Sequence, residues 1–178
     1  MHFESSEVTG KYTKEVTREH ERGDLTAKWL MLTLELNGEK NAHHVLGFTK
    51  NPTPNFNLTT EYKNVKDSKK ADGAIVINSS VTAIIELKGT KTTDLSKIEE
   101  QAFGYKNNQP DCKYIITSNF EKLRFYIDNA IEHLEFNLFE LTFEQFQLLY
   151  LCLACENISA DIPAKNESRI SQSRGCNY

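Results

Sequence analysis

The most regular pattern of apolar and polar positions lies between Ala71 and Lys88, where two β-branched runs flank a short polar turn. Runs of this kind predict a β-hairpin. Side chains alternate between the two faces of a strand, so the second run presents an apolar face that we expect to meet the core. That face consists of Val81, Ala83, Ile85 and Leu87. The alternate positions place Glu86 and Lys88 together on the opposite face.

The expected strand pairing brings two carboxylates together. If Ile77 pairs with Val81 across the turn formed by residues 78–80, Asp72 lies directly opposite Glu86. Facing side chains on neighbouring strands have Cβ atoms about 5 Å apart, and like charges there destabilise the pair. A divalent cation relieves that repulsion, and Mg²⁺ suits a site with one or two carboxylates because it keeps several waters. The hairpin therefore predicts a magnesium site, provided that the register does not slip by one residue.

Downstream of the hairpin the pattern predicts further helices and strands of an α/β domain. A helix begins near Thr93 or Asp94, either of which can cap it, and its packed stripe is formed by Leu95, Ile98, Ala102 and Tyr105. Strands are expected at residues 57–63, 113–117, 123–127 and, as an edge strand, 134–138. A last helix, capped by Thr142, spans 142–155 with core positions at Phe143, Phe146, Leu149 and Leu153. A strand, a helix and a strand in that order predict a parallel pair with a right-handed crossover.

The first part of the chain is less clearly patterned. Residues 12–37 fit a helix with Leu25, Trp29, Leu32 and Leu36 on one face, while the alternation of leucines from Leu30 to Leu36 also fits a strand. We expect residues 1–10 to be mobile and residues 39–56 to form a loop, which carries His43 and His44 on its surface. The expected domain covers residues 1–157, and residues 158–178 are expected to form a polar tail or the start of a linker.

Composition adds limits to this picture. The chain has 178 residues, 39% of them hydrophobic and 26% charged, which fits one globular domain. No apolar run reaches the length of a membrane span and no signal peptide is visible, so we expect a cytoplasmic location without a membrane partner. The net charge of −4 does not indicate a nucleic-acid binder. Cys152 and Cys155 lack a second pair that would complete a zinc site, and we interpret them as buried thiols.

A family resemblance rests on the hairpin and the helix after it. Asp72, thirteen intervening residues and Glu86-Leu87-Lys88 resemble the signature of the PD-(D/E)XK nuclease superfamily. Gln101 and Tyr105 form a Gln-x-x-x-Tyr motif that resembles the nuclease domains of type I and type IIG restriction enzymes. The run from Lys70 to about Asn157 looks like the amino-terminal nuclease domain of type IIG enzymes. The resemblance implies a restriction-endonuclease-like core, an α/β fold with a mixed central β-sheet flanked by helices.

The resemblance also implies roles for individual residues. Asp72 and Glu86 are expected to bind Mg²⁺, or Mn²⁺, together with the backbone carbonyl of Leu87. Lys88 is expected to orient the attacking water or to stabilise the transition state. Gln101 is expected to position DNA or water, with Tyr105 as its support. The family often adds an acid from the first helix, and the sequence does not select among the candidates Glu15, Glu19, Glu21 and Glu35.

The function implied by the resemblance is a Mg²⁺-dependent DNA endonuclease domain that hydrolyses phosphodiester bonds. Its partner is DNA, and it is expected to lack the methyltransferase and target-recognition modules of type IIG enzymes. Such a domain would act with those modules, or with a second copy of itself for double-strand cleavage. Two alternatives stay open at this point: a repair or recombination nuclease of the same superfamily, and a catalytically silent DNA-binding remnant of the fold.

Overall fold

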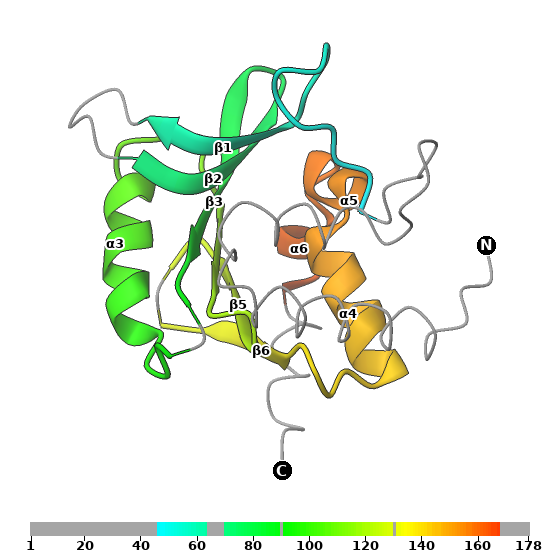
Figure 1. The fold of residues 1–178 in the computed structure, drawn as a ribbon. Coiled ribbons are helices and arrows are strands. Elements are labelled where there is room, and N and C mark those ends of the chain that lie inside the picture. Colours follow the sequence, from blue (N-terminus) through cyan, green and yellow to red (C-terminus); the bar gives the residue numbers. More distant parts are fainter. Residues whose placement is uncertain (1–45, 64–69, 90, 130, 168–178) are drawn as a thin grey trace.

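The computed structural model describes residues 46–63, 70–89, 91–129 and 131–167 (Figure 1). The helix expected over residues 12–37, the four candidate glutamates that it carries, the mobile segment 1–10 and the histidines 43 and 44 lie outside the described residues. The same applies to most of the connection between residues 64 and 70.

A six-stranded sheet forms the centre of the fold, and its strand order follows the chain from β1 to β6. The strands are β1 (Leu58–Lys63), β2 (Lys70–Ile77), β3 (Ser80–Leu87), β4 (Tyr114–Ser118), β5 (Lys122–Ile127) and β6 (His133–Asn137). Neighbouring strands are antiparallel except β3 and β4, which are parallel and are connected through helix α3 (Ser96–Lys106). The predicted α/β class, the mixed sheet and the parallel pair are confirmed.

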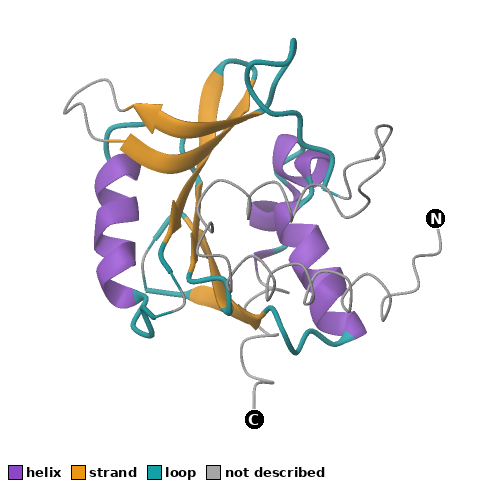
Figure 2. Cartoon of the chain, viewed as in Figure 1, coloured by secondary structure: helices purple, strands orange, loops and turns teal. Residues whose placement is uncertain are grey.

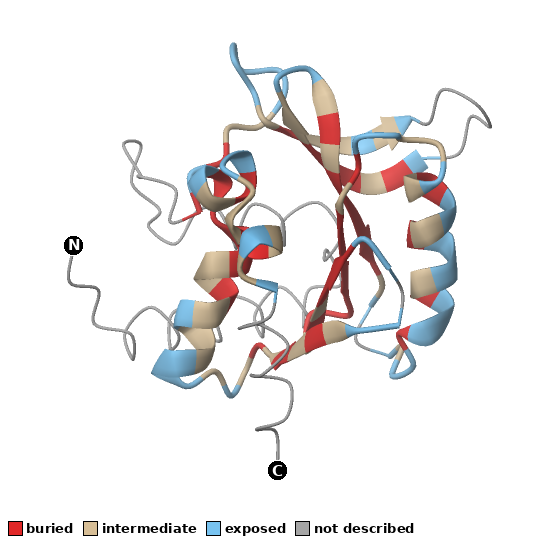
Figure 3. Cartoon of the chain, turned by 180° about the vertical axis from the view of Figure 1, so that it is seen from behind, coloured by how far each residue is buried: buried red, intermediate tan, exposed pale blue. Residues whose placement is uncertain are grey.

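Helices cover both faces of this sheet (Figures 1 and 2). Helix α3 packs on one face, and α4 (Phe143–Leu153), α5 (Cys155–Ser159) and α6 (Ile162–Lys165) lie on the other. Strand β3 is apolar on both sides for this reason: Ile85 belongs to the larger core, with residues of α4 and α5, while Ile84 packs with α3. The central strands are consequently buried on both faces (Figure 3).

The turn of the hairpin is tighter than the sequence analysis predicts. Asn78 and Ser79 have positive φ values of 50° and 66°, the conformation of a two-residue turn whose twist matches that of the flanking strands. Ile77 therefore pairs with Ser80. The predicted pairing of Ile77 with Val81 is wrong, because the turn contains two residues rather than three.

A β-bulge then compensates for the short turn. The register shifts between Ile75 and Val76: Val76 pairs with Val81, but Ile75 pairs with Ala83, which leaves Thr82 as the extra residue of β3. A bulge turns the side chains on either side of it relative to the regular alternation. Val81 therefore packs in the cluster on the α3 face, and its predicted place on one face with Ala83 is wrong.

Helix α4 begins with the predicted cap. The Thr142 hydroxyl accepts a hydrogen bond from the Gln145 amide at 3.3 Å, and the Gln145 side chain accepts one from the Thr142 amide at 3.0 Å. Leu149 and Leu153 are buried as predicted. Phe143 is 46% exposed, and its predicted core position is wrong because the buried residues of α4 are confined to its second half.

The helical layer continues beyond the point where the sequence suggests a polar tail. Ile158 of α5 and Pro163 of α6 are buried. Asp161, between these helices, accepts hydrogen bonds from Lys113 Nζ at 2.7 Å and from the Tyr114 hydroxyl at 2.5 Å, and so connects the layer to the start of β4. Cys152 and Cys155 are buried thiols, as interpreted from the sequence. None of the helices in the described part of the chain has the length and apolarity that a membrane span requires.

The capping box of α4 gives a stability prediction. Thr142→Ala removes one acceptor and leaves the Gln145 amide unpaired, so we expect the free energy of unfolding to fall by about 1 kcal/mol. Urea unfolding followed by circular dichroism measures the change. Thr93→Ala serves as the control, because Thr93 is exposed and the first amide of α3 is bonded by Asp94 instead, at 2.9 Å. Equal effects of the two substitutions would contradict the role of the cap.

Candidate active site

Asp72 and Glu86 face each other on β2 and β3, beneath helix α3. Gly73 pairs with Ile85, and the next position of the same antiparallel register sets Asp72 opposite Glu86. One Asp72 oxygen, Oδ2, accepts a hydrogen bond from the backbone N–H of Leu87 at 2.7 Å. Asp72 is half-buried and Glu86 is 0% exposed. The structure therefore brings together the carboxylate pair on which the sequence analysis depends.

The pKa of Glu86 is raised by its surroundings. Burial raises the pKa of Glu86 from its ordinary value of 4.5 to about 8. The Asp72 carboxylate adds to this rise, and the Lys88 ammonium opposes it. Lys88 is thus close enough to Glu86 to act on its charge, as Asp72 does. A pKa this high favours the protonated form of Glu86 at neutral pH in the absence of a cation, because burial, and then the neighbouring Asp72, disfavour its charge.

Helix α3 brings a third side chain to the pair. Gln101 Nε2 donates hydrogen bonds to Glu86 Oε2 at 3.0 Å and to the Tyr105 hydroxyl at 3.3 Å. The Tyr105 hydroxyl in turn donates to the backbone carbonyl of Lys70, at the start of β2, at 2.7 Å. Tyr105 is buried, so it both packs in the core under α3 and supports Gln101.

A row of polar residues continues from Glu86 across the same face of the sheet. Glu86 pairs with Thr117 of β4, Thr117 with Arg124 of β5, and Arg124 with Glu135 of β6. Thr117 is fully buried, with its hydroxyl beside that of Tyr126. Among the described residues, neither Glu86 Oε1 nor Thr117 Oγ1 has a hydrogen-bond partner of normal geometry.

This polar row was not predicted from the sequence. The signal available was the alternation in strand 122–127, where Lys122, Arg124 and Tyr126 share one face. That alternation identifies a polar face but not its neighbours, because the order and register of the strands decide which residues meet.

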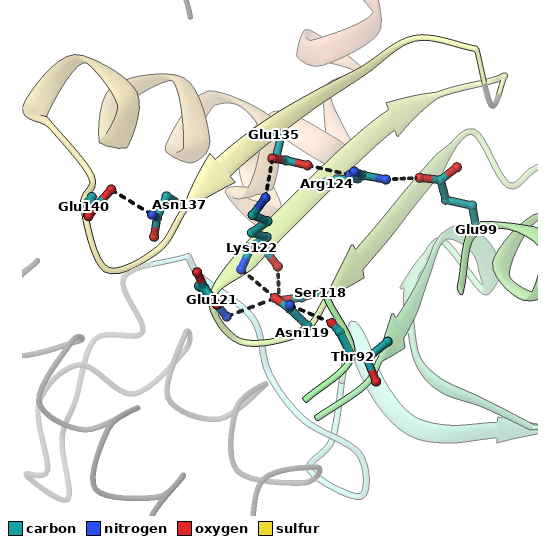
Figure 4. Close-up of polar contacts among 10 residues, drawn as sticks. All are labelled: Thr92, Glu99, Ser118, Asn119, Glu121, Lys122, Arg124, Glu135, Asn137 and Glu140. Atoms are coloured by element: carbon teal, nitrogen blue, oxygen red, sulfur yellow. Dashed lines mark hydrogen bonds and ion pairs between the residues drawn. The ribbon is translucent and has the colours of Figure 1, made fainter. Parts of the chain in front are cut away.

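The loops that follow β3 and β4 border the site. The Lys88 amide donates to the carbonyl of Ser118 at 2.9 Å. The Asn119 side chain donates to the carbonyl of Thr92, also at 2.9 Å (Figure 4). Asn119 also accepts a hydrogen bond from the Lys122 amide at 2.7 Å. These contacts fix the carboxyl ends of the two parallel strands side by side, the edge of an α/β sheet at which ligands commonly bind.

The residues present fit a hard cation with few protein ligands. Within the described ranges, no group of three or more His, Cys, Asp and Glu side chains is placed to hold a metal ion. Two carboxylates are sufficient for Mg²⁺, which retains waters in its coordination shell. Glu86 Oε1 is a buried oxygen that has no hydrogen-bond partner of normal geometry among the described residues, although Asp72 is its neighbour. A cation next to it would remove the penalty of leaving it unpaired. Asp72 and Glu86, with the neighbouring Leu87 carbonyl, are the residues that would hold it.

Comparison of the chain with models of known protein families, with curated proteins and with solved structures finds no match.

The raised pKa of Glu86 predicts how the stability of the metal-free protein depends on pH. Between pH 4.5 and about 8 the folded protein keeps a proton that the unfolded chain has released. The free energy of unfolding should therefore fall as pH rises through this range, and the loss should be complete above pH 8. Glu86→Gln removes the titration, so its stability relative to wild type should increase by roughly 2 to 4 kcal/mol between pH 5 and 8.5.

Thermal and urea unfolding in the presence of a chelator measure this difference. Glu140→Gln, at an exposed carboxylate, is the matched control and should follow the wild-type pH dependence. Parallel pH dependences of wild type and Glu86→Gln would contradict the buried, protonated state of Glu86.

Proposed function

We propose that this chain is a Mg²⁺-dependent DNA endonuclease domain with a restriction-endonuclease-like core, related in its chemistry to type IIG restriction enzymes. The observation that carries the proposal is the facing pair of Asp72 and Glu86, which share one site with Lys88 and Gln101. Two opposed carboxylates destabilise a hairpin, so a chain that keeps them has a use for the charge. Cation binding for phosphodiester hydrolysis is the use that fits all four side chains.

Each side chain has a role in that reaction. A Mg²⁺ ion held there would lower the pKa of its water and neutralise charge that develops on the phosphate. Asp72 and Glu86 supply the negative charge for the ion, and the hydrogen bond from the Leu87 amide fixes the orientation of Asp72. Lys88 supplies a positive charge near the reacting phosphate. Gln101 holds Glu86 Oε2 and leaves Oε1 available.

The arrangement of the fold supports the same proposal. The acids lie on the β2–β3 hairpin, the crossover helix α3 carries the Gln-x-x-x-Tyr motif over them, and β4 returns parallel to β3. This order of hairpin, helix and parallel strand is the one that the resemblance to PD-(D/E)XK nucleases implies. A repair or recombination nuclease of the superfamily would share it, and the DNA substrate separates the two.

DNA is the proposed partner, and contacts to its phosphates are expected to dominate. Lys91 and Lys97 are exposed on the segment that follows Lys88. Phosphate contacts position DNA but carry no sequence information, so we expect weak binding and nicking without marked sequence preference. Target choice would come from a recognition module, and double-strand cleavage from a second copy of the site.

The test is a plasmid-nicking assay with Mg²⁺. We expect the wild-type protein to nick supercoiled plasmid and Glu86→Ala to be inactive, because it loses a cation ligand. Lys88→Ala should lose at least about a hundredfold in rate, the usual cost of removing one group that stabilises the transition state. It should leave cation binding, measured by calorimetry, largely intact. Glu144→Ala, at an exposed position of α4, is the control for substitution itself. Undiminished nicking by purified Glu86→Ala would contradict the assignment.

One observation favours a second candidate, a DNA-binding scaffold without catalysis. Glu86 is 0% exposed, and a catalytic carboxylate must be reached by the cation and by water. The two candidates differ in their response to Mg²⁺. The endonuclease should melt at a higher temperature with Mg²⁺ and nick DNA, whereas the scaffold should bind DNA equally well with and without Mg²⁺ and leave it intact.

A further inference from the structure

Helix α3 is attached to the sheet on both flanks of its buried stripe. Ile98 and Ala102 face the sheet and are buried. Gln101 extends from one flank to Glu86 on β3, while Glu99 extends from the other flank toward β5. Two residues along a helix correspond to about 200° of rotation, so contacts at positions 99 and 101 restrain the same helix from opposite sides.

The contacts of Glu99 are strong ones. Its Oε1 accepts hydrogen bonds from Arg124 Nη1, at 2.5 Å, and from the hydroxyl of Tyr126. Arg124 Nε donates to Glu135 Oε2 at 2.7 Å, so one guanidinium connects the helix to the edge strand β6 (Figure 4). The side chains of Arg124 and Glu99 are only 19% and 18% exposed. Charge-assisted hydrogen bonds shielded from water in this way hold geometry far better than exposed ion pairs.

We propose that Glu99 and Arg124 are positioning residues for the carboxylate site: they fix the rotation of α3 about its axis and thereby hold the Gln101 amide on Glu86. A rotation of α3 by 20° would move its side-chain tips by about 2 Å, given a helix radius with side chains of about 6 Å. That displacement is enough to break the 3.0 Å hydrogen bond between Gln101 and Glu86. The expected effect on cleavage rests on the proposed endonuclease function, whereas the effect on Gln101 does not.

The chain offers a closely matched control. Asp161 accepts hydrogen bonds from a cation, Lys113, and from a tyrosine hydroxyl, Tyr114, as Glu99 does from Arg124 and Tyr126. This second arrangement belongs to the helices on the other face of the sheet. Asp161→Ala therefore removes a contact of the same kind without touching α3.

The first readout is the side-chain amide of Gln101, followed by nuclear magnetic resonance. In Glu99→Ala we expect its proton resonances to move toward values for an unbonded amide, and its exchange with water to accelerate about tenfold, the equivalent of one lost hydrogen bond. Asp161→Ala should leave both unchanged. An unperturbed Gln101 amide in Glu99→Ala would overturn the proposal.

The second readout is single-turnover nicking of plasmid. Glu99→Ala should lower the maximal rate by about tenfold to a hundredfold, the effect of misplacing a catalytic group by an ångström or two, with the half-saturating DNA concentration unchanged. Glu99→Gln should restore most of the rate, because Oε1 alone accepts both contacts. Equal rate losses in Glu99→Ala and Asp161→Ala would show that stability, not position, is the cause.

Arg124→Lys covers the case in which Glu99→Ala does not fold. Lysine keeps the positive charge but lacks the planar guanidinium group that bonds Glu99 and Glu135 at once. Arg124→Lys should therefore cause the same changes in the Gln101 amide resonances and exchange as Glu99→Ala. A wild-type Gln101 amide in Arg124→Lys would also overturn the proposal. If wild-type protein does not nick DNA, the proposed function fails, and the resonance measurements still decide whether Glu99 and Arg124 position Gln101.

Discussion

The opposed carboxylates of Asp72 and Glu86 are the constraint on which the rest of the structure depends. Folding places Glu86 where water cannot reach it and where a neighbouring acid repels its charge. Three neighbouring groups reduce the cost of burying these acids. The Leu87 amide donates a hydrogen bond to Asp72, and Gln101 donates one to Glu86 Oε2. The positive charge of Lys88 opposes the repulsion between the two acids. Glu86 Oε1 has no hydrogen-bond partner of normal geometry among the described residues. Buried polar atoms are rarely left in this state, so the oxygen is an exception to how folded proteins satisfy their polar groups.

The geometry of that pair depends on a single extra residue in β3. The two-residue turn at Asn78 and Ser79 alone would offset β2 from β3 by one position along their whole length. Asp72 would then lie opposite Ile85 rather than Glu86. The bulge at Thr82 restores the register, and it lies near the turn, at the opposite end of the hairpin from Asp72 and Glu86. Bulges near functional residues commonly serve to direct side chains in this way.

The sequence predicted the parts of the fold that depend on local pattern. The hairpin, the stripe of α3 from Leu95 to Tyr105 and the parallel pairing of β3 with β4 follow from periodicity and chain order. The opposition of Asp72 and Glu86 was reached through a wrong pairing at the turn, which the bulge happens to offset. Phe143 was misplaced because periodicity identifies a helix face but not how much of the helix meets the sheet. Glu99, Arg124 and Glu135 were missed because they meet across α3, β5 and β6, and no local pattern encodes which distant strands become neighbours.

Two tyrosines on adjacent strands, Tyr114 and Tyr126, secure the two helical layers separately. The Tyr126 hydroxyl donates a hydrogen bond to Glu99 of α3, which also pairs with Arg124. The Tyr114 hydroxyl donates to Asp161, between α5 and α6, which also pairs with Lys113. These two sets of contacts have no residue in common, so the loss of one leaves the other in place. If α3 were displaced from the sheet, the smaller core and Glu86 would be exposed to solvent, whereas the larger core beneath α4 would stay buried. The burial of Glu86 therefore depends on the few side chains that hold α3 to the sheet, and the contacts of Asp161 do not contribute to it.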